Sequence, residues 1–381
     1  MNTMKQLLLS AMITASLCIG CGGSKKGQPA DQQADSTATA ATDQDLSTTP
    51  YFYVQLKGTL AGQALTMHLI KNGPNIFRGY YSYEKIGEPI DVWGSIDSSK
   101  HLVLFENTRS EEEITFNGSL ANDGTFTGTW RGEGTSYPFT LKRDFNDAIR
   151  FDVYYASDSA ELRPGLKGSA KGQVSNAIIW PAANTDEKIA AFIRQQLIGT
   201  SKATTPQQLL KDQVHDFLID YQGNINTIDS SGIDDDFTAA TWNWSDEGDV
   251  KVVWNKFPLL VIERYGYSYT GGAHGNGGSS YTTLDLEKKK VLKITDLFKP
   301  GYQHPMEDLL ATAFREKYKM APTDPLNSML LVDTIPVSEN FYMTDKGVGF
   351  SYTAYEIGPY AMGQVTLFLP FTRLRQYMKE P

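Results

Sequence analysis

The chain reads Tyr269-Thr270-Gly271-Gly272-Ala273-His274-Gly275-Asn276-Gly277-Gly278 in its C-terminal half, and most of that half is organised around this stretch. It lies between a run of alternating tyrosines and a second strand-like run at residues 281–286. Five glycines occupy the eight positions from 271 to 278. Glycine permits positive φ and close backbone approach because it has no Cβ, so the pattern predicts a glycine-rich connection between two strands.

The alternating tyrosines are Tyr265, Tyr267 and Tyr269, directly before the glycines. Side chains alternate along a strand, so these three fall on one face and lead into the loop. An exposed tyrosine row beside a loop suits a sugar or a protein surface. A row that packs beneath a helix would be ordinary strand packing. The sequence leaves both interpretations open, and Gly271, Gly272 and Asn276 complete the candidate binding surface.

His274 stands among these glycines, where its imidazole would be accessible to a ligand or a proton. A Ser-His-Asp arrangement would recruit Ser279 or Ser280, but the chain has no Gly-x-Ser-x-Gly elbow. The favoured interpretation is that His274 hydrogen-bonds to backbone and shapes the loop. We therefore assign no catalytic residue, and His274 stays a candidate ligand-binding residue.

Other patterns that resemble metal or phosphate sites lack the required spacing. The acidic run at 234–236 fits no EF-hand loop, because no bidentate glutamate follows at the right distance. No Lys-Ser or Lys-Thr follows the glycines, as a phosphate loop requires. His68 and His101 have no cysteine or carboxylate at ligand spacing. The sequence predicts no metal and no cofactor.

The composition is that of a globular protein. The chain has 381 residues, of which 40% are hydrophobic, enough for two or three domains with their own cores. The formal net charge is −9, so a basic surface patch is not expected. Because phosphate binding needs a basic surface, nucleic acid is excluded as an expected partner.

The N-terminus has the pattern of an export signal. Lys5 precedes an apolar run at residues 7–19, which is typical of a secretory signal peptide. The segment Leu17-Cys18-Ile19-Gly20-Cys21 resembles the lipobox of bacterial lipoproteins. The resemblance implies a signal peptide at 1–20, a lipid on Cys21 and a membrane as partner. The residues after Cys21 are not acidic, which favours an outer-membrane anchor that faces the periplasm.

Residues 21–50 are mostly small and polar, so they cannot bury enough surface to fold and are predicted to be a disordered tether. Residues 51–143 read as short strands separated by turn residues, without a helical period. They predict an all-β antiparallel meander or small barrel. An eight-stranded barrel is narrow enough for side chains to fill its interior, which we favour over a ligand cavity.

Residues 149–381 alternate between strand-like and helical segments and predict an α+β domain with an antiparallel sheet and packed helices. Helices are expected at 186–197 and 206–221, where apolar residues recur at helical spacing. Strands are expected at 237–244 and 250–257, joined by a turn at Asp246-Glu247-Gly248-Asp249. The fold class of the whole chain is α+β.

The order of motifs in this half is specific. The glycine-rich stretch is followed by Asp296-Leu297-Phe298 and then by Tyr355-Glu356-Ile357-Gly358-Pro359-Tyr360. Over about residues 150–380 this order resembles a bacterial extracellular domain family of unknown function, shared by lysozyme-sensing anti-sigma factors and some peptidoglycan deacetylases. The resemblance implies a module that binds something at the cell wall, with Glu356 and Tyr360 close to the glycine loop.

Three functions are compatible with the sequence. The first is a non-enzymatic, lipid-anchored binding protein of the cell envelope whose ligand is a lysozyme-like protein or a peptidoglycan component. The second is an envelope hydrolase or deacetylase that uses His274. The third is an assembly scaffold lipoprotein whose N-terminal meander binds another envelope component. The absence of partner residues around His274 favours the first.

Overall fold

The computed structural model describes residues 45–46, 49–108, 112–224 and 241–380. Cys21 and the predicted signal peptide lie outside these residues, as does nearly all of the predicted tether. In the part of the chain that is described, no helix is both long and apolar enough to cross a membrane.

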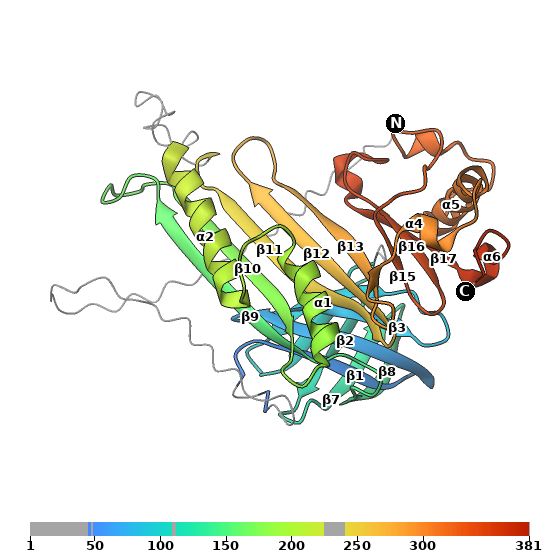
Figure 1. Cartoon of the computed structure of the whole chain (residues 1–381), viewed down its shortest axis with the longest axis horizontal. Coiled ribbons are helices and arrows are strands. Elements are labelled where there is room, and N and C mark those ends of the chain that lie inside the picture. The colour runs from blue at the N-terminus through green and yellow to red at the C-terminus, as the bar shows by residue number, and fades with distance from the viewer. Residues whose placement is uncertain (1–44, 47–48, 109–111, 225–240, 381) are drawn as a thin grey trace, which may run out of the picture. The chain divides into compact units, whose positions relative to one another are not determined.

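Eight strands close into an antiparallel barrel (Figure 1). Each strand pairs with the next in sequence, and the eighth pairs back with the first. Residues such as Leu56, Met67 and Phe116 fill the interior and are fully buried. The predicted meander or small barrel is confirmed. Its strands are β1 (Phe52–Leu60), β2 (Gln63–Gly73), β3 (Ile76–Tyr83), β4 (Ile90–Ile96), β5 (Leu102–Glu106), β6 (Thr115–Leu120), β7 (Phe126–Gly132) and β8 (Thr135–Arg143).

A six-stranded sheet follows, with the order β14-β13-β12-β11-β10-β9. All neighbours are antiparallel except β10 and β11, which are parallel. Parallel neighbours need a long crossover, and α1 (Glu187–Ile198) and α2 (Pro206–Gly223) lie within it. The strands are β9 (Phe151–Glu161), β10 (Lys171–Pro181), β11 (Ser245–Lys256), β12 (Leu259–Tyr269), β13 (Asn276–Asp285) and β14 (Lys290–Val291).

The turn predicted at 246–249 is wrong. These residues lie inside β11, which is continuous and pairs with both β10 and β12. The polar run is compatible with a strand because Asp249 meets barrel residues: Asn72 donates a hydrogen bond to its carboxylate at 3.1 Å, and Arg78 lies 3.5 Å away. Of the strand predicted at 237–244, residues 237–240 lie outside the described residues. Residues 241–244 are not in a strand, because β11 begins only at Ser245.

The C-terminal part contains a three-stranded antiparallel sheet with the order β15-β16-β17 and its own core. Phe314 of the long helix packs with Phe350 and Leu367 of the sheet, and all three are almost fully buried. This arrangement and the previous sheet confirm the predicted α+β fold. The elements are α4 (Ile294–Leu297), α5 (Gln303–Lys317), η3 (Leu326–Ser328), β15 (Phe341–Met343), β16 (Gly347–Tyr352), η4 (Tyr360–Met362), β17 (Val365–Pro370) and α6 (Phe371–Leu374).

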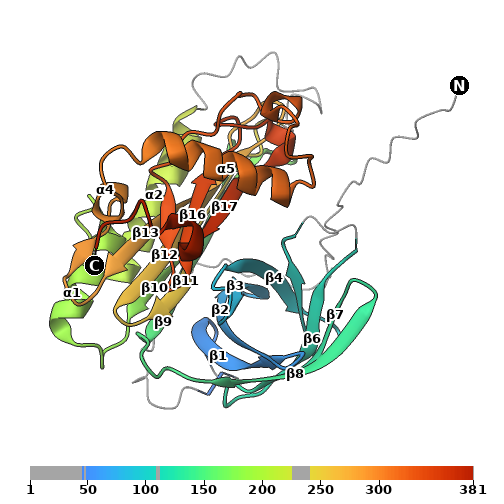
Figure 2. The same ribbon diagram turned by 90° about the vertical axis from the view of Figure 1, so that its right-hand side faces the viewer.

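The outer face of β1, β2 and β3 packs against the six-stranded sheet (Figure 2). Side chains alternate along β11, so Val252 joins the core that contains the helices, whereas Val253 joins Tyr80 of the barrel. The barrel strands are correspondingly buried on both faces over part of their length, for example from His68 to Ile70. Barrel and sheets belong to one compact unit.

Candidate functional site

The glycine-rich stretch connects β12 to β13, as predicted. The pairing of the two strands extends to Ser268 and Asn276, so residues 270–275 form the connection. Gly271 and Gly272 have φ values of 98° and 92°, in the left-handed region that residues with a Cβ rarely adopt. The glycines are therefore required by the shape of the loop.

His274 is exposed and forms an aromatic cluster with two tyrosines from the segment between β16 and β17. Its ring stacks on Tyr360 with 3.8 Å between ring centroids, and Tyr355 lies 6.4 Å away. The Nδ1–H donates to the Gly275 carbonyl at 2.9 Å, because a carbonyl can only accept. Tyr360 donates to the same carbonyl at 2.7 Å, and the Tyr355 hydroxyl lies 3.4 Å from Nε2.

Tyr355 is the residue of this cluster that the sequence did not single out. Its side chain is 56% exposed, and its φ is 70°, which is uncommon for a residue with a side chain. Such conformations concentrate at functional sites, where the surrounding structure maintains them. The signal in the sequence was the pair of tyrosines that bracket Glu356-Ile357-Gly358-Pro359, of which only Tyr360 was assigned.

The predicted tyrosine row divides into two parts. Tyr267 packs over Gly275, so that any side chain at Gly275 would collide with its ring. Tyr269 donates to the Gly272 carbonyl at 3.1 Å. Tyr265 instead lies beneath the guanidinium of Arg78, 5.5 Å from its ring centroid, at the boundary with the barrel. Tyr267 and Tyr269 therefore belong to the loop, and Tyr265 does not.

The remaining predicted residues have different roles. Glu356 accepts hydrogen bonds from the backbone N–H and hydroxyl of Thr353, at 2.9 and 3.4 Å, and so closes the turn that presents Tyr355. Asn276 is exposed at the start of β13, with its backbone paired to Ser268. Within the described ranges, neither side chain bonds to the aromatic cluster.

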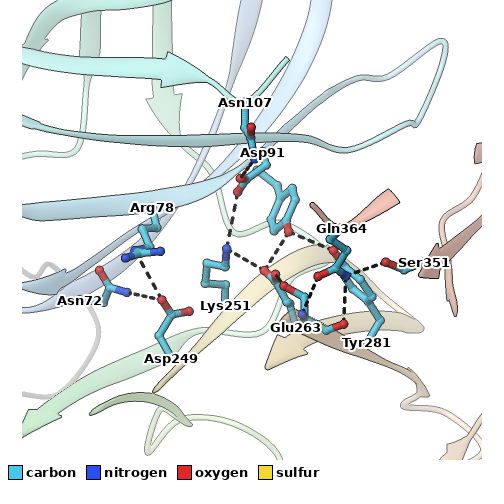
Figure 3. A network of polar contacts seen from close by, with 12 residues as sticks. Asn72, Arg78, Asp91, Asn107, Asp249, Lys251, Glu263, Tyr281, Ser351 and Gln364 are labelled. Atoms are coloured by element: carbon cyan, nitrogen blue, oxygen red, sulfur yellow. Dashed lines mark hydrogen bonds and ion pairs between the residues drawn. The ribbon is translucent and has the colours of Figure 1, made fainter. Parts of the chain in front are cut away.

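A buried network of charged and polar groups lies at the base of the hairpin (Figure 3). Lys251 is 2.8 Å from Glu263 and 3.5 Å from Asp91 of the barrel. Glu263 also accepts from the Tyr80 hydroxyl at 2.8 Å and from the Ser279 hydroxyl. Charged residues inside the apolar runs of β11 and β12 are the signal of this network in the sequence, and no site was predicted from them.

The base of the hairpin is also bound to the three-stranded sheet. Gln364 accepts from the Ser279 N–H at 2.6 Å and donates to the Ser279 carbonyl at 3.0 Å. Its amide nitrogen also donates to the Ser351 hydroxyl at 2.6 Å (Figure 3). The hairpin that carries His274 and the segment that carries Tyr355 are therefore fixed relative to each other.

Burial and neighbouring charges together set the pKa values in this network. Burial disfavours the charge on Lys251, but the carboxylates of Glu263 and Asp91 outweigh it and hold the Lys251 pKa above its ordinary value. Burial raises the pKa of Asp249 to about 6, although Lys251 and Arg78 oppose the shift. One oxygen of Asp249 has no hydrogen-bond partner, which agrees with this upward shift.

The aromatic cluster is suited to contact with a ligand. The imidazole of His274 bonds to a carbonyl and lies near a phenol, and no carboxylate of a described residue hydrogen-bonds to it. The described ranges also contain no group of three His, Cys, Asp or Glu residues arranged to hold a metal ion. The exposed surface consists of aromatic rings and glycine backbone.

Comparison with known families agrees with the resemblance seen in the motifs. Residues 170–277 match the family described as "Deacetylase PdaC", and residues 295–372 match "Protein of unknown function (DUF3298)". The glycine loop lies in the first match and Tyr355 and Tyr360 lie in the second. The predicted resemblance is confirmed.

Individual relatives are distant. The chain is 24% identical over 135 residues to the peptidoglycan-N-acetylmuramic acid deacetylase PdaC of Bacillus subtilis (strain 168), covering 35% of this chain and 29% of that protein. A crystal structure of a DUF3298 family member from Bacteroides fragilis has a TM-score of 0.56 at 24% identity, covering 62% of this chain and 96% of that one. A DUF3298 family protein from Pseudomonas aeruginosa PAO1 has a TM-score of 0.43 at 18% identity, covering 61% and 97%. The Bacteroides structure shows that the fold is shared.

Proposed function

We propose that the protein is a non-enzymatic binding protein of the bacterial cell envelope that recognises peptidoglycan glycan through His274, Tyr355 and Tyr360. It is held to the outer membrane, on the periplasmic side, by a lipid on Cys21. The anchor rests on the lipobox-like sequence around Cys21. The proposed binding requires neither a metal nor a cofactor.

The observation that carries the proposal is the exposed aromatic cluster with Tyr355 in a left-handed conformation. Tyrosine and histidine rings present an apolar face with a polar edge, which suits the alternating apolar and hydroxyl surfaces of a sugar. The Gly275 carbonyl already accepts from His274 and Tyr360, so the rings are oriented before a ligand arrives. Preorganised rings lose little entropy on binding.

The match to the Bacillus deacetylase supports the choice of ligand. That protein is named for peptidoglycan, and the family match at 170–277 includes the glycine loop up to Gly277. Because the alignment covers 29% of that protein, only the ligand class is taken from it and no reaction.

Titration of the full chain in detergent micelles with soluble peptidoglycan glycan strands tests the proposal by calorimetry. Tyr355→Ala should weaken binding about tenfold, as expected when a central aromatic contact is lost. Tyr137→Ala, which removes a 40% exposed tyrosine of the barrel, should leave binding unchanged. A wild-type protein that does not bind these strands would refute the glycan proposal.

The second arm uses a lysozyme-like protein as the ligand. If the wild type binds that protein but not the glycan strands, and Tyr355→Ala loses this binding, then the aromatic cluster recognises a protein partner instead of glycan. Release of acetate or of glycan fragments by the wild type would favour the hydrolase or deacetylase instead.

A further inference from the structure

A cavity of about 60 Å³ lies between the outer face of the barrel and β11. Gln55, His68 and Ser82 line it from three neighbouring barrel strands, and Trp254, Lys256 and Asp345 line it from the other side. One water molecule needs about 10–15 Å³ of such volume, so the cavity has room for about four to six water molecules. This site shares no residue with the aromatic cluster.

Three buried polar side chains line this cavity, and each has a polar atom to which no described residue forms a hydrogen bond. Gln55 is 1% exposed, and His68 and Ser82 are each 3% exposed. The Tyr53 hydroxyl accepts from the Asn255 amide at 3.1 Å, and it lies 3.0 Å from His68 Nδ1 and 3.5 Å from the Gln55 side-chain carbonyl oxygen. The other ring nitrogen of His68, Nε2, is a donor or an acceptor according to which ring nitrogen carries the hydrogen.

No described residue forms a hydrogen bond with His68 Nε2, with the Gln55 amide nitrogen or with the Ser82 hydroxyl. These three atoms keep some solvent-accessible surface, whereas Trp254 Nε1 is fully buried and has no hydrogen-bond partner. Buried polar groups are normally hydrogen-bonded, so these three groups take their partners from inside the cavity, either from water or from a ligand. An acceptor oxygen in the cavity satisfies the Gln55 amide and the Ser82 hydroxyl.

The side chains that line the cavity carry no net charge. Two are cationic, Lys57 and Lys256, and two are anionic, Glu84 and Asp345. Lys256 lies 2.8 Å from Asp345. Burial, followed by the charge of Lys57, lowers the pKa of His68 to about 3, so its imidazole is neutral at pH 7. A neutral donor set with no excess charge favours an uncharged ligand over an anion. The indole of Trp254 supplies an apolar wall.

We propose that this cavity binds a small neutral group with a carbonyl oxygen, of the size of acetamide, whose oxygen accepts from the Gln55 amide and the Ser82 hydroxyl, with His68 Nε2 beside it. The proposal does not depend on the glycan site, because the barrel strands, β11 and Asp345 line the cavity and none of these residues belongs to the aromatic cluster.

Titration of the full chain with acetamide, followed by the imidazole nitrogen signals of His68 in NMR, tests the proposal. A ligand of this size should bind with a Kd on the order of 1 mM and shift these signals to saturation. Gln55→Leu keeps the volume but removes the donor, and should weaken binding about tenfold, while Ser136→Ala on an exposed barrel position serves as the control.

Ser82→Ala provides a smaller change if Gln55→Leu does not fold, and should also weaken acetamide binding. Acetate is the second probe and should bind more weakly than acetamide. Absence of a saturable shift, tighter binding of acetate, or unchanged binding in both cavity variants would each overturn the proposal. A crystal soaked in acetamide that holds only water in the cavity would do so as well.

Discussion

Tyr355 combines an exposed ring with a backbone conformation that favours glycine. At a φ of 70°, replacement by glycine removes backbone strain of about 1 kcal/mol but also removes the ring. We expect Tyr355→Gly to keep or slightly raise the free energy of unfolding in urea while weakening glycan binding about tenfold. Tyr137→Gly, in β8, should instead lose about 1 kcal/mol because its backbone is extended. A large loss of stability in Tyr355→Gly would contradict this account.

His274 acts in the proposal through its ring face, since it stacks on Tyr360 at 3.8 Å. Phenylalanine retains stacking and loses both ring nitrogens. His274→Phe should therefore keep glycan affinity within about threefold, whereas His274→Ala should lose about tenfold. Calorimetric titration of both variants with glycan strands measures these two affinities. Equal losses would show that the nitrogens matter more than the ring face.

His68 makes stability depend on pH. Its pKa in the folded protein is lowered to about 3 from 6.5, so the unfolded chain takes up a proton first as the pH falls. Stability is therefore present above pH 6.5 and is lost between about pH 6.5 and 3. Between pH 7 and 5 the wild type should lose about 2 kcal/mol more than His68→Gln in urea unfolding. His101→Gln, at an exposed position, should follow the wild-type curve.

At the scale of elements, β11 carries two lysines in different surroundings. Lys251 is 4% exposed and pairs with Glu263, itself 2% exposed, whereas the side chain of Lys256 is 59% exposed in its pair with Asp345. Removing one partner of a buried pair leaves an uncompensated charge, so Lys251→Met should cost about 3–5 kcal/mol. Lys256→Met should cost less than about 1 kcal/mol. A loss for Lys251→Met as small as that for Lys256→Met, measured by urea unfolding, would show that the buried network adds little to stability.

The glycine loop shows which features of an element can be predicted from neighbouring residues in the sequence. Glycine density and the flanking strand patterns predicted the connection of β12 and β13, because turn conformation depends on neighbouring residues. The same kind of local reasoning misassigned residues 246–249 as a turn. Their strand conformation depends on Asn72 and Arg78, which lie far away in the sequence.

At the scale of the whole molecule, the barrel and the six-stranded sheet share cores. Tyr53 and Ile70 of the barrel pack with Ile178 and Leu260 of the sheet, and Tyr80 packs with Trp254. We expect a single unfolding transition, with coincident curves from tryptophan fluorescence and far-UV circular dichroism. Two separate transitions would mean that the barrel is an independent unit. Deleting residues 51–143 would expose these apolar residues, so point variants are the better test of a scaffold role.

The sequence by itself determined the α+β class, the barrel, the strand connection at the glycines and the family resemblance, since alternation, turn residues and motif order are local or linear properties. It also placed Tyr360 near the loop through that resemblance. Only the tertiary structure decided that Tyr355 meets His274, 81 residues away, and that Tyr265 belongs to the barrel boundary. Side chains distant in sequence become neighbours through packing, and whether a polar residue is buried with a partner depends on what another element brings to it.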